Sequence, residues 1–417
     1  MNTETTNYYE LLKARSEEKR KSEPEPRFAN GSFLPQVVVR GGALQDIAWD
    51  KIEYLQEAVR KWHRFAWSDI LRVAEVVGWE TIILAIEKNQ KQGVVDAAVE
   101  YRKQNGLTTH DMDAMYIISV NGTLGVGFDH TTLEHTPERE IGMAYTCPMI
   151  QGIRDMGMEN NPLMKDFSLW CDTYDNMELR ATSPDIWYTH THCLGKGDKY
   201  CRYFVDYRKP EPGENYYQTL KRFRDVKRKE SDASAPGGTV ANEFRYGNSI
   251  QKPVTTEKLG LTKEDELNLG VQIQRRIGVS TILIGAELIG WEKMINGMYT
   301  NQVPRLTELS RNVGAKWNIT GTTPLDGAVL MHIGMLGSGF DDHQATSWIS
   351  KRVEGVARTC PLVESAKESG LENKMEDMNI WCTAWHNANA SAMNKNVTCT
   401  FTHCLAKGDK LCRWIVE

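Results

Sequence analysis

Cysteine residues recur in this chain at spacings that suit a metal site. Two sets of three share the same intervals, 22 residues and then eight: Cys171, Cys193 and Cys201, followed by Cys382, Cys404 and Cys412. The last two members of each set flank a short loop rich in glycine and lysine, and a β-hairpin there would bring their thiolates together. Three thiolates and one imidazole form a preferred shell of structural zinc. The spacing therefore predicts one metal site in each set, for zinc or for iron or another divalent metal.

Histidine is the expected fourth ligand of the first site. His190 and His192 both precede Cys193. In a regular strand the two imidazoles share one face and Cys193 points to the other, so a twist or a bulge must bring them together. His190 or His192 could be the fourth ligand, and we place His190 in the predicted site. The alternative interpretation is that the cysteines are small apolar residues in a core, which is a common environment for this residue type.

The second set differs from the first at its histidines. Phe401 stands where the first set has His190, whereas His403 matches His192. We therefore assign His403 to the second site. Cys399, which lies just upstream, is an alternative ligand for that site.

Three further groups have the chemistry of catalysis. Cys147, in a Thr-Cys-Pro segment, is expected to begin a helix, where the positive end of the helix dipole favours the thiolate. Such a thiolate serves as a nucleophile or a metal ligand, and the plain alternative is a capping residue. Asp129 and His130 place a carboxylate beside an imidazole, which suits a general acid/base pair but also an exposed turn. His192 is a further candidate for proton transfer.

The chain contains two copies of one pattern. The segment THCLGKGDKYCRYFV, from Thr191 to Val205, agrees with THCLAKGDKLCRWIV, from Thr402 to Val416, at 11 of 15 positions. Upstream motifs recur at offsets of 211 to 213 residues, and eight of the nine cysteines fall into four matched pairs that leave Cys399 over. Such self-similarity is the signature of a tandem repeat.

The repeat divides the 417 residues into four segments. We expect an N-terminal arm over 1–40, a first repeat over 41–206, a linker over 207–255 and a second repeat over 256–417. The arm and the linker are polar and carry proline, glycine and serine, which is typical of connecting segments.

Helices are expected first in each repeat. Residues 49–90 show apolar positions at helical spacing, with an expected break near 66–68. A further helix is expected to end at Gly106, because glycine commonly follows the last helical turn.

Strands are expected later in each repeat. Residues 113–129 read as a strand, an Asn-Gly turn and a second strand. Ile186–His192 and Tyr200–Tyr207 read as two strands joined by the tight loop of the cysteine motif. Helices followed by strands indicate an α+β fold. We expect two tandem domains, each with helices packed on a twisted antiparallel sheet, arranged as a pseudo-dimer.

Composition excludes several classes of function. The net charge is −5, and phosphate binding requires a basic surplus, so we expect no nucleic-acid partner. No apolar run reaches the roughly 18–20 residues of a membrane helix, so we expect no membrane partner. The N-terminus lacks the apolar region of a secretory signal. We therefore expect a cytoplasmic protein, where clustered cysteines bind metal or do chemistry more often than they pair.

The order of the motifs resembles a known family. Thr-Cys-Pro, then Trp-Cys-Asp at Trp170–Asp172, then Thr-x-Cys-Leu-x-x-Gly-Asp-x-x-Cys, is similar to L-2-amino-thiazoline-4-carboxylic acid hydrolase-like proteins. The hairpin motif alone is similar to the 4-vinyl reductase domain. The resemblance covers residues 60–206 and 270–417. It implies a 4-vinyl-reductase-like domain in each copy and, from the name of the hydrolase family, the opening of a small cyclic amidine-like ring by water.

The resemblance also implies a ligand set for zinc. In sensor domains of the 4-vinyl reductase type, zinc is held by an upstream cysteine, an acidic residue three positions before the first hairpin cysteine, and both hairpin cysteines. The matching positions here are Cys171, His190, Cys193 and Cys201, with histidine in place of the acid. Phe401 at the second copy departs from the pattern.

Three functions are compatible with these residues. The first is a hydrolase that opens a small heterocyclic or alicyclic substrate, with a metal-bound water or the Cys147 thiolate as nucleophile. The second is a zinc-stapled module that binds a small molecule, and the third is a structural partner subunit; either allows a homo-oligomer. The first copy has Asp172 and His190 where the second has Thr383 and Phe401. That asymmetry favours the hydrolase, with its working site in the first copy.

Overall fold

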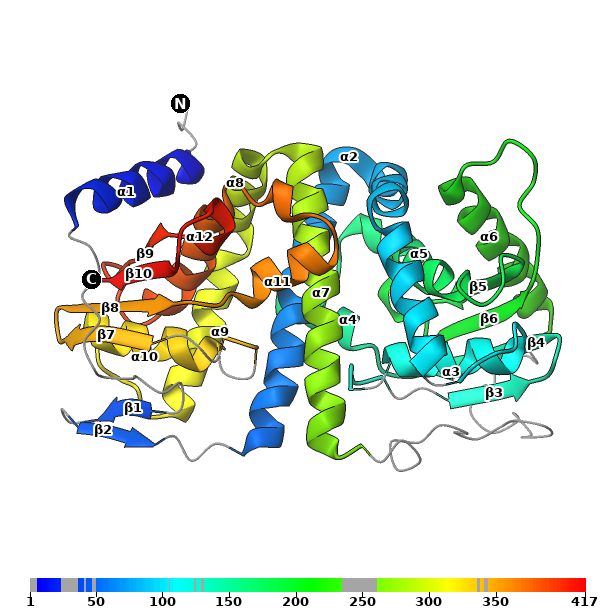
Figure 1. Ribbon diagram of the computed structural model, residues 1–417, viewed down its shortest axis with the longest axis horizontal. Helices are drawn as coiled ribbons and strands as arrows, with labels where there is room; N and C mark the ends of the chain where they lie inside the picture. Colours follow the sequence, from blue (N-terminus) through cyan, green and yellow to red (C-terminus); the bar gives the residue numbers. More distant parts are fainter. Residues whose placement is uncertain are drawn as a thin grey trace. The chain divides into compact units, whose positions relative to one another are not determined.

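The computed structural model describes most of the chain (Figure 1). The described residues are 6–23, 37–40, 43–46, 50–104, 106–123, 125–128, 131–234, 261–335, 338–340 and 344–417. They form two compact units. Unit 1 combines residues 1–72 with residues 274–417, and unit 2 consists of residues 73–273. Within these described ranges, no helix is both long and apolar enough to cross a membrane.

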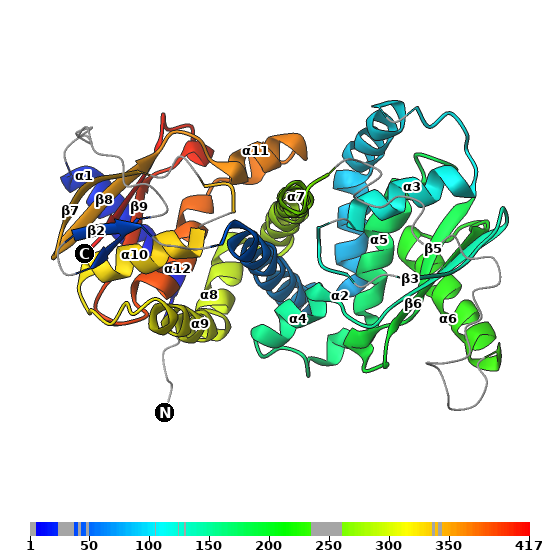
Figure 2. The same ribbon diagram turned by 90° about the horizontal axis from the view of Figure 1, so that it is seen from below.

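Unit 2 is built on a four-stranded antiparallel sheet. Its strands, in sheet order, are β3 (Thr131–His135), β4 (Arg139–Ala144), β6 (Cys201–Tyr207) and β5 (Ile186–His192). The helices of the unit are the second part of α2 (Lys51–Gln104), α3 (Met112–Thr123), α4 (Pro148–Asp155), α5 (Phe167–Leu179) and α6 (Tyr216–Ser234), with short 3-10 turns η1 (Pro162–Asp166) and η2 (Leu194–Lys196). Both α5 and α6 pack against β5, an edge strand (Figure 2).

Unit 1 is built on a second sheet of the same order. Its strands are β7 (Gln344–Ile349), β8 (Arg352–Ala357), β10 (Cys412–Val416) and β9 (Cys399–His403), and a separate pair is formed by β1 (Val37–Arg40) and β2 (Ala43–Asp46). Its helices are α1 (Tyr8–Ser22), α8 (Trp291–Asn301), α9 (Val303–Lys316), α10 (Pro324–Met335), α11 (Pro361–Glu368) and α12 (Met378–Ala390), with parts of α2 and α7 (Lys263–Ile289) and the turns η3 (Glu372–Lys374) and η4 (Leu405–Lys407). The predicted α+β class with antiparallel sheets is confirmed.

Neither compact unit consists of a single sequence repeat. Residues 51–72 of α2 belong to unit 1, together with the second cysteine set, whereas the rest of α2 belongs to unit 2. Conversely, residues 263–273 of α7 belong to unit 2. Each unit therefore combines the sheet and most helices of one repeat with the first part of the long helix of the other.

Two helices lie in the segments that the sequence analysis assigned to an arm and a linker. They are α1 and α6, and their sequences repeat each other: residues 7–22 and 215–230 agree at 8 of 16 positions, beginning with Asn-Tyr-Tyr. α6 packs on β5 in unit 2, and α1 packs on β9 in unit 1. α1, which precedes the first repeat, thus covers the sheet of the second, and α6, which precedes the second repeat, covers the sheet of the first.

The prediction of two strands over residues 113–129 is wrong. Residues 112–123 form the helix α3. Met112, Met115 and Tyr116, at the i, i+3 and i+4 positions of one helix face, are buried in a cluster with residues of β5 and β6. The β-branched residues and the Asn-Gly pair favour a hairpin locally, but burial of this apolar face against the sheet stabilises the helix.

The predicted break near residues 66–68 is also misplaced. The backbone remains helical there and departs from helical geometry at Gly78, with φ 78° and ψ 162°. Gly290, which precedes α8, has nearly the same conformation, with φ 83° and ψ 147°. A positive φ is readily adopted by glycine alone, so the two Gly-Trp-Glu motifs mark equivalent kinks.

Several predicted elements are confirmed. α4 begins at Pro148 with Cys147 at its N-cap position. β5 covers Ile186–His192, as predicted, and β6 begins one residue later than predicted. These elements depend on local signals, namely a proline in the first helical turn and aromatic and β-branched residues on either side of a glycine-rich loop.

Candidate functional site

The loop between β5 and β6 positions two cysteines of the first set. Cys193 follows the end of β5 and precedes a 3-10 turn, after which Gly197 has φ 93°. The backbone N–H of Leu194 donates to Cys201 Sγ at 3.3 Å, and the N–H of Cys193 donates to the Asp198 carboxylate at 2.8 Å. A main-chain N–H of the loop therefore faces the Cys201 sulfur, and the Asp198 carboxylate holds the beginning of the loop in place.

The second copy reproduces this loop closely. Leu405 N–H donates to Cys412 Sγ at 3.4 Å, and Cys404 N–H donates to Asp409 at 2.8 Å. Gly408 takes the same left-handed conformation as its counterpart, with φ 82°. The repeated geometry shows that the cysteine motif specifies one local structure wherever it occurs.

Four thiols gather at this loop in unit 2. The Cys201 thiol interacts directly with the thiols of Cys147 and Cys193, and the hydrogen bond to Cys147, with burial, raises the pKa of Cys201 to about 12. Cys171, on α5, is also close enough for its pKa to respond to Cys193 and Cys201, although burial is the main cause of its raised value. The cysteine of the Thr-Cys-Pro segment is thus the fourth member of the cluster.

Unit 1 contains the equivalent cluster. Cys412 interacts directly with Cys360 and Cys404, and these contacts raise the pKa of Cys412. Its hydrogen bond to Cys360 is the main reason that the pKa of Cys360 is lowered. Cys382 is buried nearby, and Cys404 and Cys360 contribute to its raised pKa after the larger effect of burial. All nine cysteines of the chain are free thiols.

The donor types of these clusters suit zinc, which prefers thiolates held by neighbouring N–H groups. In the part of the chain that the structure describes, however, no group of three or more histidine, cysteine, aspartate or glutamate side chains is arranged to hold a metal ion as placed. The thiols therefore form contact clusters.

His190 is engaged with residues other than these cysteines. Its Nδ1 lies 2.7 Å from Asp172 Oδ1, and its backbone N–H donates to the same oxygen at 3.0 Å. Its Nε2 lies 3.4 Å from the Tyr188 hydroxyl. The expected bulge is present between His190 and His192. It leaves His192 Nδ1 3.0 Å from the Thr191 hydroxyl.

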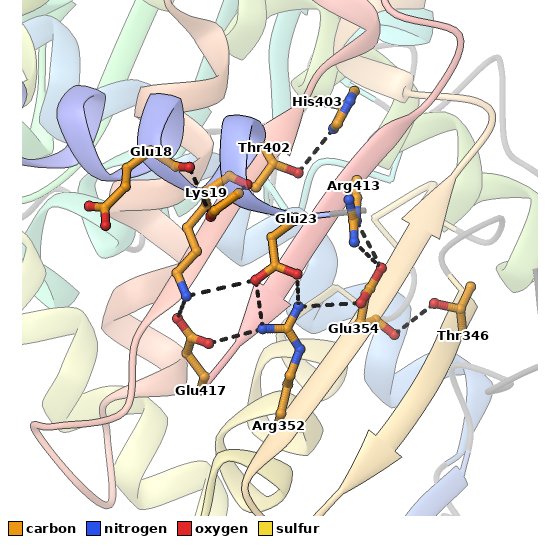
Figure 3. Close-up of polar contacts among 11 residues, drawn as sticks. Glu18, Lys19, Glu23, Thr346, Arg352, Glu354, Thr402, His403, Arg413 and Glu417 are labelled. Carbon is orange, nitrogen blue, oxygen red and sulfur yellow. Dashed lines mark hydrogen bonds and ion pairs between the residues drawn. The ribbon is translucent and has the colours of Figure 1, made fainter. Parts of the chain in front are cut away.

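His403 occupies the position equivalent to His192. Its Nδ1 lies 3.0 Å from the Thr402 hydroxyl, as Figure 3 shows. The charge of His403 helps to lower the pKa of Asp409, after the larger effects of Arg20 and of the Cys404 backbone N–H. Cys399, the alternative ligand, is buried with its sulfur 3.6 Å from the sulfur of Met331. The predicted pair Asp129 and His130 lies outside the described residues.

The Asp172–His190 pair is buried beside a second carboxyl. The Asp172 side chain is 1% exposed and that of His190 is 12% exposed. Burial lowers the pKa of His190, but the hydrogen bond and charge of Asp172, with the charge of Asp175, outweigh it and raise the pKa. Burial raises the pKa of Asp175 to about 7. Asp172 Oδ2 is buried without a hydrogen-bond partner among the described residues.

A polar and aromatic chain leads from this pair towards the surface. The rings of Tyr188 and Tyr203 stack at 4.7 Å, and the Tyr203 hydroxyl donates to Glu140 at 3.0 Å. Glu140 Oε2 lies 3.5 Å from His135 Nδ1, and His135 Nε2 lies 2.6 Å from the exposed Asp113. The buried ionisable side chains of unit 2 therefore extend well beyond Asp172 and His190, the two residues that the comparison of the copies singled out.

The second copy has different residues at the positions of these acid/base groups. Phe401 N–H donates to Thr383 Oγ1 at 3.1 Å, in the place of the His190–Asp172 backbone bond. The strand register places Val353 where the first copy has Glu140, and Trp414 where it has Tyr203. Asp172, His190, Tyr203 and Glu140 therefore have no counterpart of the same residue type in the second copy, whereas both copies retain four cysteines.

Helices α6 and α1 each hold one of the two cysteine loops through an arginine. Arg228 of α6 donates to Asp198 at 2.9 Å and to the Thr191 carbonyl oxygen at 2.9 Å. Arg20 of α1 donates to Asp409 at 2.6 Å. Each arginine thus holds the carboxylate that accepts the N–H of the first hairpin cysteine.

Charged side chains hold the C-terminal end of α1 against the sheet of unit 1 (Figure 3). Lys19 pairs with Glu417, and Arg352 contacts Glu23 at 2.7 Å and Glu417 at 3.1 Å. In unit 2 the equivalent pair of α6 is Lys227 with Asp206 at 3.0 Å. The two helices therefore make equivalent contacts with equivalent sheets.

Four residues of this site carry no local sequence signal for it, namely Asp175, Tyr188, Tyr203 and Glu140. A comparison of the two copies, position by position, would have singled them out, because each has a different residue type at its counterpart. The repeated Asn-Tyr-Tyr helix was a second signal, present in segments that composition marked as connections.

No family model matches the chain, and no curated protein or solved structure matches it either. The interpretation of the site therefore depends on its own geometry and on the difference between the two copies.

Proposed function

We propose that unit 2 is a hydrolase that opens a small cyclic substrate, with His190 as the general base and Asp172 as the residue that orients it. The observation that carries this proposal is the buried Asp172–His190 contact of 2.7 Å, together with the unsatisfied Asp172 Oδ2. Buried acceptors without partners are rare in proteins and are expected where a ligand or water binds. The equivalent Thr383 and Phe401 have no acid/base chemistry.

The geometry assigns a role to each nitrogen of the imidazole. Nδ1 carries the proton that it donates to Asp172, which leaves Nε2 as the acceptor. Nε2 takes a proton from water while the water oxygen adds to the amidine carbon of the ring. The imidazolium then returns the proton to the ring atom that leaves as the ring bond breaks. Asp172 stabilises the imidazolium, as a carboxylate does beside a catalytic histidine.

Asp175 is suited to exchange protons with the solvent or the substrate. Its pKa of about 7 lies near the pH at which a general acid and base work best. It lies three residues after Asp172 on α5, so the two carboxyls share one helix face. Cys147 interacts with Cys201, and we assign it to the thiol cluster rather than to nucleophilic attack.

The test uses the ring named by the family resemblance. The full chain is incubated with 2-aminothiazoline-4-carboxylate and with a panel of simple cyclic amidines, and product is detected as a mass increase of one water. We expect ring opening by the wild type and a loss of about 10²–10⁴-fold in the rate for His190→Gln and Asp172→Asn.

The second copy provides the matched control. Phe401→Leu changes the residue equivalent to His190, and we expect it to retain the wild-type rate. Equal rates for His190→Gln and wild type, with both proteins folded, would refute the role of His190. Absence of ring opening across the panel would favour a module that binds a small molecule without catalysis.

A further inference from the structure

We propose that the site of unit 2 takes a cyclic amidine as its protonated cation and discriminates against amidines whose ring carries a carboxylate. This inference rests on the proposed function and names the charge of its substrate. It is carried by three carboxyl groups, those of Asp172, Asp175 and Glu140, that lie beside the stacked rings of Tyr188 and Tyr203. Among the described residues, no lysine or arginine pairs with any of the three.

The three carboxyl groups come from one helix and one strand. Asp172 and Asp175 lie three residues apart on α5, and Glu140 lies on β4. Tyr203 is in register with His190, and its hydroxyl donates to Glu140 at 3.0 Å. Register partners project from the same face of a sheet. The Asp172–His190 pair and the Glu140 carboxyl therefore belong to one face of the sheet of unit 2.

The charge of Asp175 connects these two groups. Burial is the main reason that the pKa of Tyr188 is raised, and the charge of Asp175 adds to it. Burial and Glu140 raise the pKa of Tyr203, and Asp175 contributes in the same direction. Asp175 also acts on His190. The carboxyls of α5 and β4 therefore act on one set of rings.

Imidazoles supply the only positive charge that acts on these carboxyls among the described residues. His190 is the one such group that acts on Asp175, and it also contacts Asp172 at 2.7 Å. His135 is the one such group that acts on Glu140. Three carboxyls thus share two imidazoles. A ligand with a positive charge improves this balance, whereas a carboxylate would be buried beside like charges without a cationic partner, which is costly.

The second oxygen of Asp172 calls for a donor. Asp172 Oδ1 accepts from the backbone N–H of His190 and contacts its ring, whereas Oδ2 is buried without a hydrogen-bond partner among the described residues. A protonated amidine is planar and directs charged N–H donors outwards, and hydrogen bonds from such donors to a carboxylate are strong. A ring carboxylate offers acceptors only.

The second copy has none of these carboxyls. Thr383, His386 and Val353 stand at the positions of Asp172, Asp175 and Glu140. Unit 1 nevertheless forms a sheet of the same order, covered by the equivalent helix α12. The fold therefore does not require the acidic group, which supports a role in binding.

Calorimetric titration of the full chain tests the charge preference without relying on turnover. Three probes are compared: 2-amino-2-thiazoline, which is a cation at neutral pH; 2-aminothiazoline-4-carboxylate, which adds a carboxylate to the same ring; and thiazolidin-2-one, a neutral ring of the same size. We expect the cation to bind at least about tenfold more tightly than either of the others, since unfavourable juxtaposition of like charges opposes the carboxylate.

Two isosteric variants locate the preference. Asp172→Asn and Asp175→Asn each remove one negative charge, and each should reduce the preference for the cation by about threefold or more. Asp96→Asn, an exposed carboxyl on α2, is the control and should leave the preference unchanged. Asp175 is only partly buried, so its variant supplies the comparison if Asp172→Asn does not fold.

The outcomes separate this inference from the hydrolase proposal. Equal or tighter binding of the carboxylate-bearing ring, or no binding of any probe, would overturn the charge preference, while ring opening would still support the hydrolase. An unchanged preference in both folded variants would also overturn it. Selective binding of the cation without ring opening would support the charge preference and contradict the hydrolase.

Discussion

The guanidinium of Arg20 binds the carboxylate of Asp409, which lies 389 positions later in the sequence. The same contact joins Arg228 to Asp198, which are only 30 residues apart. Both pairs connect a helix to the loop of the cysteine motif, but the first connects opposite ends of the chain. The relationship shows that the repeats exchange their helices, since the helix at the start of one repeat completes the sheet of the other.

Arg20→Met should destabilise unit 1 more than unit 2. The Arg20 side chain is 45% exposed, so solvent screens the ion pair, and we expect a loss of about 1 kcal/mol. Unfolding in denaturant, followed by hydrogen exchange of the backbone amides of each unit, measures the effect. Arg228→Met is the matched variant and should weaken unit 2 instead. Equal effects of both variants on both units would contradict the exchange.

Cutting the chain between the repeats should not separate its halves. A protease site inserted between residues 235 and 260 allows cleavage after folding. Because each unit contains segments of both repeats, we expect the two fragments to elute together from a sizing column under native conditions. They should separate in denaturant. Separation under native conditions would show that each repeat folds by itself.

Asp69 should make the stability depend on pH. It is buried and accepts hydrogen bonds from Gln302 and Trp381, and burial raises its pKa to about 7. The folded state therefore binds more protons than the unfolded state between about pH 4 and 7, and this contribution to stability is lost as the pH rises through 7.

Asp69→Asn isolates that contribution. Relative to the variant, the wild type should lose roughly 4 kcal/mol of unfolding free energy between pH 4 and pH 8, since each pKa unit corresponds to about 1.36 kcal/mol. The comparison is necessary because His63, whose pKa is lowered to about 3 by burial, has the opposite dependence. Parallel pH profiles for the two proteins would show that Asp69 is not protonated in the folded state.

Asp175→Asn should lower the pKa of His190. The charge of Asp175 is one of the effects that raise this pKa, so its removal makes the imidazolium less stable. Titration of the His190 ring nitrogens by NMR measures the shift directly, and the acid limb of any ring-opening activity should move to lower pH. Asp96→Asn, an exposed carboxyl on α2, is the control and should leave the titration unchanged.

Gly142→Ala should disturb the buried chain of unit 2. A Cβ at Gly142 would lie 1.9 Å from the Tyr203 hydroxyl oxygen, so the ring must move away from Glu140. Overpacking of this kind costs about 1–3 kcal/mol. Gly93→Ala is the contrasting variant, because a Cβ there meets nothing within 4 Å in a helix and should stabilise the protein by up to about 1 kcal/mol. Thermal unfolding of both variants compares the two effects.

Much of the hairpin and its cysteines was predictable because its signals are local. The β-branched and aromatic residues along Ile186–His192 and the glycine at position 197 are sufficient to define a strand and a turn. The helix α3 was not predictable in this way, because its β-branched residues favour a strand until Met112 and Met115 are buried against the sheet.

The members of the thiol clusters were likewise predictable only where the signal for them is local. Cys193 and Cys201 are eight residues apart on one hairpin, so their proximity could be derived from spacing. Cys147 joins them from the start of α4, and its place depends on how that helix packs. His190 was a reasonable ligand from spacing, but a carboxylate on α5, 18 residues upstream, holds its ring.

The sequence by itself determined the repeat, the order of the strands within the hairpins and the residue types available for chemistry, because periodicity and turn residues act over a few positions. The tertiary structure decided which helix covers which sheet, which cysteine completes each cluster and which carboxylate faces His190. These choices depend on contacts between residues far apart in the chain. Their free energy comes from burial and hydrogen bonding that exist only once the elements have packed together.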